Sequence, residues 1–304
     1  MAFFDWLKIV FLGIIEGITE WLPISSTGHM KLFDALWKFS SEAKNDVMTD
    51  EFWKLFLVVI QLGAILAVII LFFKKLWPFH TKKLRPQRSW FAEHSDNKAV
   101  GAVQDFCDNY CFMDKVVMWL KIFVSCLPAA IIGLLLDDWL DEKLDTFVVV
   151  AAMLIVYGIV FLIVEHFNKD RKPRATEIAQ LTWKDAILIG AFQVLALIPG
   201  TSRSGVTILG GILIGLSRGL AVEYTFFLAV PVMFGASLLK IVKNSFAFTG
   251  TQLGVLLLGM AVAFAVSYAA IRFLLNYVKT HDFTVFGWYR IGLGTIILLY
   301  AIIS

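Results

Sequence analysis

Hydrophobic and polar positions along the chain are arranged in long blocks. Six blocks are apolar over about 20 residues, at about 52–73, 117–136, 147–166, 221–242, 253–274 and 283–303. A helix of that length crosses the hydrocarbon core of a bilayer. The pattern therefore predicts six transmembrane helices.

Two further apolar regions, 3–39 and 183–216, are interrupted in the middle by Pro, Ser and Gly. The interruptions read WLPISSTGH at 21–29 and LIPGTSRSG at 197–205. Because each half is too short to span, each region is predicted to be a re-entrant helix–loop–helix hairpin. Non-helical backbone at membrane depth is tolerated only inside protein or beside water. We therefore expect a cavity at both breaks.

Composition agrees with a membrane location. Hydrophobic residues make up 59% of the 304-residue chain, against about 45–50% in soluble domains. The net charge of +3 is small and the sequence has no basic arm, which excludes nucleic acid as a partner. The fold class is therefore an all-α integral membrane protein with the bilayer as its surroundings.

The charged loops predict an orientation. Loops 74–88 and 168–184 are rich in Lys and Arg, whereas 137–146 is acidic. Excess Lys and Arg mark the cytoplasmic side, so the two basic loops are predicted to lie inside and both termini outside the cytoplasm. The polar stretch at about 80–115 is expected to be a cytoplasmic insertion.

An internal repeat is visible when the chain is aligned with itself at an offset of 177, which places Trp6 on Trp183, Gly13 on Gly190 and Ser25 on Ser202. A second match places Gly63 on Gly235. Each half contains a broken hairpin followed by three spans. Three is an odd number, so the halves are predicted to be inverted in the membrane, with both hairpins meeting near its midplane. The chain is thus predicted to be one membrane domain, 1–304, with repeats at 1–167 and 183–304.

Two carboxylates precede the first break. Glu16 and Glu20 are four residues apart, so a helix places both on one face. Ionised groups at this depth are costly and usually face a cavity or a partner. Two adjacent carboxylates predict either a retained proton or a bound cation between them. The alternative is a helix end in the interface, with both acids in water.

Hydroxyl groups and an imidazole follow at once: Ser25, Ser26, Thr27 and His29. These residue types supply a nucleophile and a general base. The alternatives are capping of the next helix by a hydroxyl group and a buried histidine with satisfied hydrogen bonds.

The second break, PGTSRSGVT at 199–207, contains Arg203 between Ser202 and Ser204. The guanidinium fork fits a phosphate, and Gly200 lets backbone N–H groups approach a ligand beside the N-terminus of the following helix. The alternative is a structural ion pair between Arg203 and Glu20. Charge clamp, nucleophile and acid–base groups together predict phosphoryl transfer from an amphiphile.

The motifs EGITEWLPISSTGHM at 16–30 and PGTSRSGVT at 199–207 strongly resemble the undecaprenyl-pyrophosphate phosphatase family, once called bacitracin-resistance proteins. The spans that contain 51–68 and 222–237 also resemble this family, whereas 80–115 is longer than the family usually has. The resemblance implies removal of the terminal phosphate from a C55 isoprenyl pyrophosphate. The product is the monophosphate carrier lipid of peptidoglycan synthesis, and bacitracin resistance follows from the same activity.

The resemblance also implies site residues and a location. Glu16 and Glu20 fall on the family's acidic motif and are the expected ligands of a divalent cation, Mg²⁺ or Ca²⁺. Catalytic roles are expected for Glu16, Glu20, Ser26, His29 and Arg203. Substrate-binding roles are expected for Ser25, Thr27, Gly200, Ser202, Ser204 and Thr207. The expected location is the bacterial inner membrane.

Three mechanisms are compatible with these residues: attack by Ser26, attack by His29, or attack by a water molecule on a cation held by Glu16 and Glu20. The competing function is a polyprenyl-phosphate transporter or flippase, since inverted repeats with broken helices suit alternating access. The oligomeric state is left open, with a homodimer among the alternatives.

Overall fold

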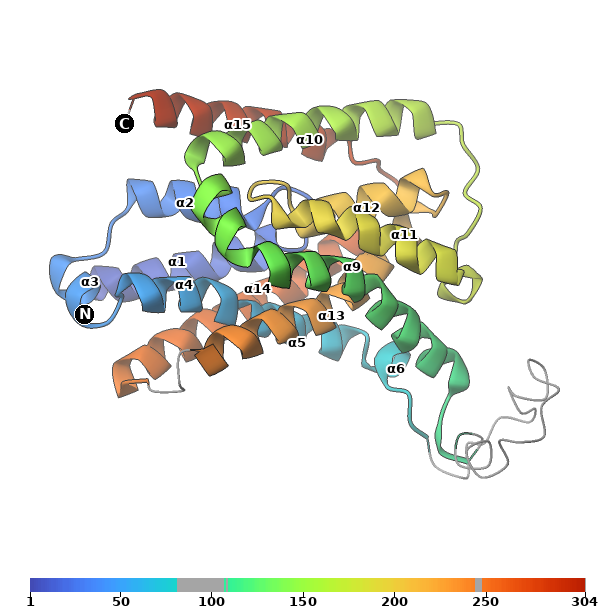
Figure 1. Ribbon diagram of the computed structural model, residues 1–304, viewed down its shortest axis with the longest axis horizontal. Helices are drawn as coiled ribbons and strands as arrows, with labels where there is room; N and C mark the ends of the chain where they lie inside the picture. Colours follow the sequence, from blue (N-terminus) through green and yellow to red (C-terminus); the bar gives the residue numbers. More distant parts are fainter. Residues whose placement is uncertain (81–106, 108, 244–247, 304) are drawn as a thin grey trace.

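The computed structural model describes residues 1–80, 107, 109–243 and 248–303. Within these ranges the chain is helical, with two isolated β-bridges, Phe79 to Cys111 and Ala175 to Leu216. The helices are α1 Phe3–Thr19, α2 Ser26–Leu36, α3 Ser41–Asp46, α4 Asp50–Val59, α5 Gln61–Leu71, α6 Phe73–Leu76, α9 Met113–Leu144, α10 Phe147–Asn168, α11 Trp183–Val194, α12 Arg203–Leu213, α13 Arg218–Lys243, α14 Gly250–Tyr277 and α15 Thr284–Ile303, with short 3₁₀ turns η3 Ile178–Gln180 and η4 Leu195–Leu197 (Figure 1).

Six stretches are long and apolar enough to cross a membrane: Asp50–Leu71, Met113–Leu136, Phe147–Asn168, Arg218–Val242, Gly250–Tyr277 and Thr284–Ile303. They coincide with the six predicted spans, so the all-α membrane fold is confirmed. The two interrupted regions form α1–α2 and α11–α12, with a non-helical loop in each. Re-entry of these hairpins through one membrane face stays a prediction, because it depends on where the bilayer lies.

The first span, Asp50–Leu71, is confirmed, with the single turn residue Ile60 between α4 and α5. One predicted boundary is wrong, because α9 is 32 residues long and continues to Leu144, through most of the acidic segment that we expected to be a loop. That segment contains good helix formers and no Gly or Pro, so nothing in it stops the helix. Most of the predicted insertion at 80–115 lies outside the described residues.

The two halves exchange their hairpin helices. Helix α1 packs along α14 of the second half, and α11 packs along α9 of the first half, while α10 and α15 pack along each other (Figure 1). The first two contacts are equivalent under the repeat. Gly13 of α1 lies against the backbone of α14, and its repeat partner Gly190 lies against the backbone of α9; an added Cβ would come within 3.0 Å of a carbonyl oxygen at Gly13 and 2.6 Å at Gly190. The repeat boundaries themselves stay a prediction.

The hairpin loops lie in the interior of this bundle. Trp21, in the first loop, is completely buried and makes an edge contact with Phe226 of α13, with ring centroids 5.2 Å apart. Most of α12 is buried as well. Both loops are therefore held between helices of opposite halves, which places their polar groups at the centre of an apolar molecule.

Candidate active site

The two loops have the same backbone conformation where each meets its second helix. Ser25 and Ser202 have φ values of 71° and 73°, in the left-handed region that is uncommon for residues other than glycine. Each hydroxyl oxygen caps the following helix, accepting from the N–H of Gly28 at 3.5 Å and of Gly205 at 3.2 Å. The capping alternative is thus confirmed for Ser25, and Ser202 caps its helix in the same way. Strained backbone of this kind concentrates at functional sites.

One buried side chain joins the loops. Arg290 of α15 is 0% exposed, and its guanidinium donates hydrogen bonds to the carbonyl oxygens of Pro23 at 3.1 Å, Gly200 at 3.1 Å and Thr201 at 2.8 Å. Carbonyl dipoles thereby surround a charge in the apolar interior. No role was predicted for Arg290 from the sequence. Its position as a charge within the otherwise apolar span 283–303 was the signal that could have identified it.

Glu20 bridges the two motifs. Its Oε2 accepts a hydrogen bond from the Ser26 hydroxyl at 2.9 Å, and its Oε1 accepts from Arg203 Nη2 at 3.1 Å. The side chains of Glu20 and Arg203 are 9% and 11% exposed. The predicted alternative of an ion pair between the hairpins is therefore confirmed. Because a carboxylate touches the serine hydroxyl, the arrangement also provides an acceptor for its proton.

A cavity of about 180 Å³ lies beside this bridge. Residues of both loops line it, together with Gln61 of α5 and three residues of α13: Glu20, Ser25, Ser26, Thr27, Gln61, Ala196, Ile198, Pro199, Gly200, Ser202, Arg203, Val232, Met233 and Ala236. The cavity predicted from the two breaks is confirmed, and it is a single one that both breaks share. Gln61 is a polar lining residue that the sequence analysis missed, because it lies in an apolar span away from either motif.

Gly200 has a backbone requirement at this cavity. Its φ is +92°, and a Cβ added there would lie 2.6 Å from the Val150 carbonyl oxygen. Only glycine fits both conditions without strain. The close approach brings α10 against the second loop.

Four predicted site residues do not line the cavity: Glu16, His29, Ser204 and Thr207. His29 lies one turn further along α2, where its Nδ1 is 2.7 Å from the Ser25 carbonyl oxygen and its Nε2 is 2.7 Å from the Tyr289 hydroxyl. The hydroxyl of Ser204 lies 3.3 Å from the Leu22 carbonyl oxygen, and that of Thr207 donates to the Arg203 carbonyl oxygen at 2.9 Å. The Ser204 hydroxyl thus joins the second motif to the first loop, whereas the Thr207 hydroxyl bonds within α12 and accepts a hydrogen bond from Thr225 of α13.

Glu16 lies one helical turn before Glu20 and is 1% exposed. Its Oε1 has no hydrogen-bond partner among the described residues. A buried carboxylate oxygen without a partner, four residues from a second carboxylate, fits the oxygen donors that Mg²⁺ and Ca²⁺ take. The described residues contain no cluster of three acidic, histidine or cysteine ligands, so remaining donors would have to come from amides, hydroxyls, water or the substrate.

The family model described as Bacitracin resistance protein BacA matches residues 9–296. The chain belongs to this family. In this BacA-family member, most of the residues that line the cavity belong to the two motifs at 16–30 and 199–207, and the others come from α5, α13 and the segment just before the second motif.

Named relatives match over nearly their whole length. An undecaprenyl-diphosphatase of Enterococcus faecalis is 50% identical over 299 residues, covering 98% of each chain. One of Acetivibrio thermocellus is 51% identical over 294 residues, covering 97% of each chain. One of Desulfitobacterium hafniense is 49% identical over 301 residues, covering 99% of this chain and 97% of the relative.

Proposed function

We propose that this protein is an undecaprenyl-diphosphatase, a membrane hydrolase that removes the terminal phosphate of a C55 isoprenyl pyrophosphate. The product is the monophosphate carrier lipid for peptidoglycan synthesis, and the activity confers resistance to bacitracin. The observation that supports this most directly is Glu20, hydrogen-bonded to Ser26 of one motif and to Arg203 of the other.

Arg203 is suited to hold the pyrophosphate. Its guanidinium lines the cavity and already pairs with an anion, Glu20. The N-terminus of α12 begins at the same residue, so its free N–H groups and helix dipole favour negative charge there. When substrate enters, the Arg203 guanidinium binds its phosphate oxygens, either in place of the Glu20 carboxylate or together with it. Electrostatic stabilisation of the charge that develops on phosphorus is then supplied by fixed groups.

Ser26 is the proposed nucleophile. Its Oγ attacks the terminal phosphorus while Glu20 accepts the hydroxyl proton, and the bond from that phosphorus to the bridging oxygen breaks. The isoprenyl monophosphate leaves, and phosphoserine remains. A water molecule then attacks the phosphoserine, which releases inorganic phosphate and regenerates the hydroxyl group.

His29 is a weaker candidate for nucleophile or base, because its two ring nitrogens contact Ser25 and Tyr289 and not Ser26. Stacking on the Tyr289 ring, with centroids 5.6 Å apart, orients the imidazole further. In our proposal His29 positions α2 behind the cavity. The substrate-binding roles of Ser204 and Thr207 likewise become positioning roles.

A divalent cation, Mg²⁺ or Ca²⁺, would be held by Glu16 and Glu20. It would supply charge neutralisation of the pyrophosphate. The unpartnered Oε1 of Glu16 supports this assignment.

The inner membrane is the proposed location, with both termini outside the cytoplasm. Helix α13 then begins at Arg218 on the cytoplasmic side and reaches the cavity at Val232. These fourteen residues rise roughly 21 Å, which places the cavity just past the middle of the span and nearer the outer face. Access from that face suits removal of phosphate outside the cytoplasm.

The direct test is phosphate release by the purified protein in detergent with C55 isoprenyl pyrophosphate and Mg²⁺. Wild type should release one phosphate per lipid, and Ser26→Ala should lower kcat at least 10²-fold. Rapid acid quenching should trap phosphoserine in the Ser26 peptide of wild type. Full activity of Ser26→Ala would refute serine attack, and absence of hydrolysis by wild type would refute the enzyme assignment.

The competing function is a transporter of polyprenyl phosphate. The exchange of hairpin helices between inverted halves favours it, because opposed broken helices suit alternating access. A transporter moves the lipid unchanged, so lipid flipping in proteoliposomes by Ser26→Ala without phosphate release would favour transport over hydrolysis.

A further inference from the structure

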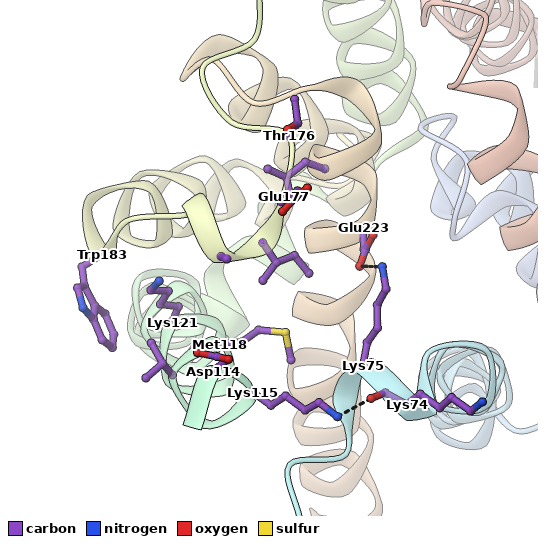
Figure 2. Close-up of a pocket in the computed structure, with 14 residues that line it drawn as sticks. Lys74, Lys75, Asp114, Lys115, Met118, Lys121, Thr176, Glu177, Trp183 and Glu223 are labelled. Atoms are coloured by element: carbon purple, nitrogen blue, oxygen red, sulfur yellow. Dashed lines mark hydrogen bonds and ion pairs between the residues drawn. The ribbon is translucent and has the colours of Figure 1, made fainter. Parts of the chain in front are cut away.

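A second and larger cavity, of about 780 Å³, lies at the opposite end of α5 and α13 from the loops. Its residues come from α6, α9, α13 and the segment around η3: Lys74, Lys75, Asp114, Lys115, Val117, Met118, Lys121, Thr176, Glu177, Ile178, Ala179, Trp183, Leu220 and Glu223 (Figure 2). None of these residues lines the active-site cavity. Along α13, Glu223 precedes Val232 by nine residues, roughly 13 Å. The two cavities are therefore separate.

Four lysines surround this second cavity, and only one of them has a carboxylate partner among the described residues. Lys75 pairs with Glu223 at 2.7 Å. Lys115 donates to the carbonyl oxygens of Lys74 and Trp77, and Lys121 to that of Leu181. Figure 2 shows the Lys115 side chain extending from α9 across to α6. Carbonyl dipoles and aromatic rings thus compensate the charges of Lys115 and Lys121, since their ammonium groups also lie 4.5 Å from the Phe112 ring and 5.8 Å from the Trp183 ring.

Burial distinguishes these lysines from two of the three acids in the lining. Lys115 and Lys121 are half-buried, whereas Asp114 and Glu177 are exposed at the mouth of the cavity. The third acid, Glu223, has a side chain that is 17% exposed and is neutralised by Lys75. An exposed carboxylate is hydrated and screened, so it neutralises little of the deeper positive charge. The inner part of the cavity is consequently suited to an anion.

The wall between the lysines is apolar. Val117 and Met118 lie on the same face of α9 as Lys121, four and three residues before it, and Leu220 and Ile178 also line the cavity. Trp183 stands at the rim with its ring half-exposed, 5.8 Å from the Lys121 ammonium group. Indole rings prefer the level of lipid headgroups. A free inorganic anion would gain nothing from contact with these apolar side chains. A lipid would place its phosphate on the lysines and its glycerol backbone against the apolar side chains.

We infer that this cavity binds the headgroup of an anionic glycerophospholipid, with Lys115 and Lys121 holding its phosphate. The orientation proposed above assigns the site to the cytoplasmic leaflet. Basic cavities between transmembrane helices on that side are suited to anionic headgroups, and the volume lies within the range of small-molecule sites. Bound lipid would tie α9 to α6 and α13 at the membrane boundary.

Native mass spectrometry of the full chain provides the test. Protein purified in detergent is titrated with phosphatidylglycerol, with phosphatidylcholine, and with inorganic phosphate. Wild type should retain one phosphatidylglycerol at concentrations where neither of the others binds. In the double variant Lys115→Gln, Lys121→Gln that affinity should fall roughly 30-fold, about fivefold for each lysine.

Lys279→Gln is the matched control, because it removes an exposed lysine on the same face, next to the C-terminal end of α14 and outside the cavity. It should retain lipid as wild type does. Lys121→Arg keeps the charge and should retain most of the affinity. Without added lipid, the Lys115→Gln, Lys121→Gln double variant should have the thermal transition of wild type. Its rate of phosphate release should stay within about twofold of wild type, which separates this site from the proposed catalytic one.

Several outcomes would overturn the inference. Equal lipid retention by the double variant would mean that the lysines do not hold the headgroup. Equal binding of phosphatidylcholine would show that the site does not require a net negative headgroup. Equal binding of inorganic phosphate would show that the site does not require a lipid. If the double variant fails to fold, the single variants provide the test. Loss of binding in Lys121→Gln with recovery in Lys121→Arg would support the inference, and unchanged binding in Lys121→Gln would overturn it.

Discussion

Replacement of Arg290 by methionine is the most informative perturbation of the active site. The side chain touches neither carboxylate of the acidic motif in the hydrogen bonds described, yet it holds the carbonyl oxygens of Pro23, Gly200 and Thr201. Methionine has similar length and fills apolar space, but it donates nothing. The substitution therefore tests whether the loops require this connection.

The magnitude follows from the three hydrogen bonds. Each hydrogen bond to a charged group contributes about 1.5–3 kcal/mol, and part of this offsets the cost of burying the guanidinium. Removing one side of a buried charged network costs about 3–5 kcal/mol. We expect this loss to appear as displacement of the loops. A displacement of about 1 Å lowers the rate roughly 10²-fold, and kcat/KM of Arg290→Met should fall by at least that factor.

The assay measures kcat and KM for phosphate release together with the thermal transition in detergent. Arg290→Lys keeps the charge without the planar fork, so it should recover only part of the activity. Arg272→Met is the matched control, since Arg272 is an exposed residue of α14 whose guanidinium lies 4.7 Å from the Tyr268 ring. An Arg290→Met enzyme within threefold of wild-type kcat/KM would refute the reasoning.

Four further substitutions or treatments have defined outcomes. Glu20→Gln keeps the shape of the side chain but removes the proton acceptor and the charge opposite Arg203, so kcat for phosphate release should fall about 10²–10⁴-fold; an unchanged kcat would exclude Glu20 as the base. Gly200→Ala forces a Cβ to within 2.6 Å of the Val150 carbonyl oxygen at a positive φ, and we expect a lower thermal transition, by about 1–3 kcal/mol of stability, with reduced turnover; a transition equal to wild type would show that the loop can relax. EDTA should abolish phosphate release, and adding Mg²⁺ or Ca²⁺ should restore it. Glu16→Gln should raise the cation concentration needed for half-maximal activity at least tenfold. A cation titration curve of Glu16→Gln identical to that of wild type would place the cation elsewhere.

Much of the fold could be predicted because it depends on local, additive properties. The number of spans follows from counting apolar residues, and the two breaks follow from Pro, Ser and Gly at 21–29 and 197–205. The one wrong boundary has a physical reason. Polar residues stop a membrane span but do not stop a helix, so α9 continues through the acidic segment to Leu144.

The site could be predicted in part. Glu20, Ser26 and Arg203 were identified from their residue types at the breaks, and the structure places them in contact. His29 was expected among them because it follows the serines closely in sequence. One helical turn was enough to direct it toward Tyr289, which lies 260 residues away. Sequence proximity therefore did not decide which side chains share the cavity.

The sequence was sufficient to predict a membrane protein with six spans and to identify the residue types at the two breaks, and it indicates two related halves. These properties depend on hydropathy, length and local backbone preference. Only the tertiary structure decided that the two breaks enclose one cavity, that Arg290 joins their carbonyl oxygens, and that Lys115 and Lys121 line a second cavity at the other end. Those arrangements depend on contacts between helices far apart in the chain, whose partners are selected by packing and by the need to satisfy every buried polar group.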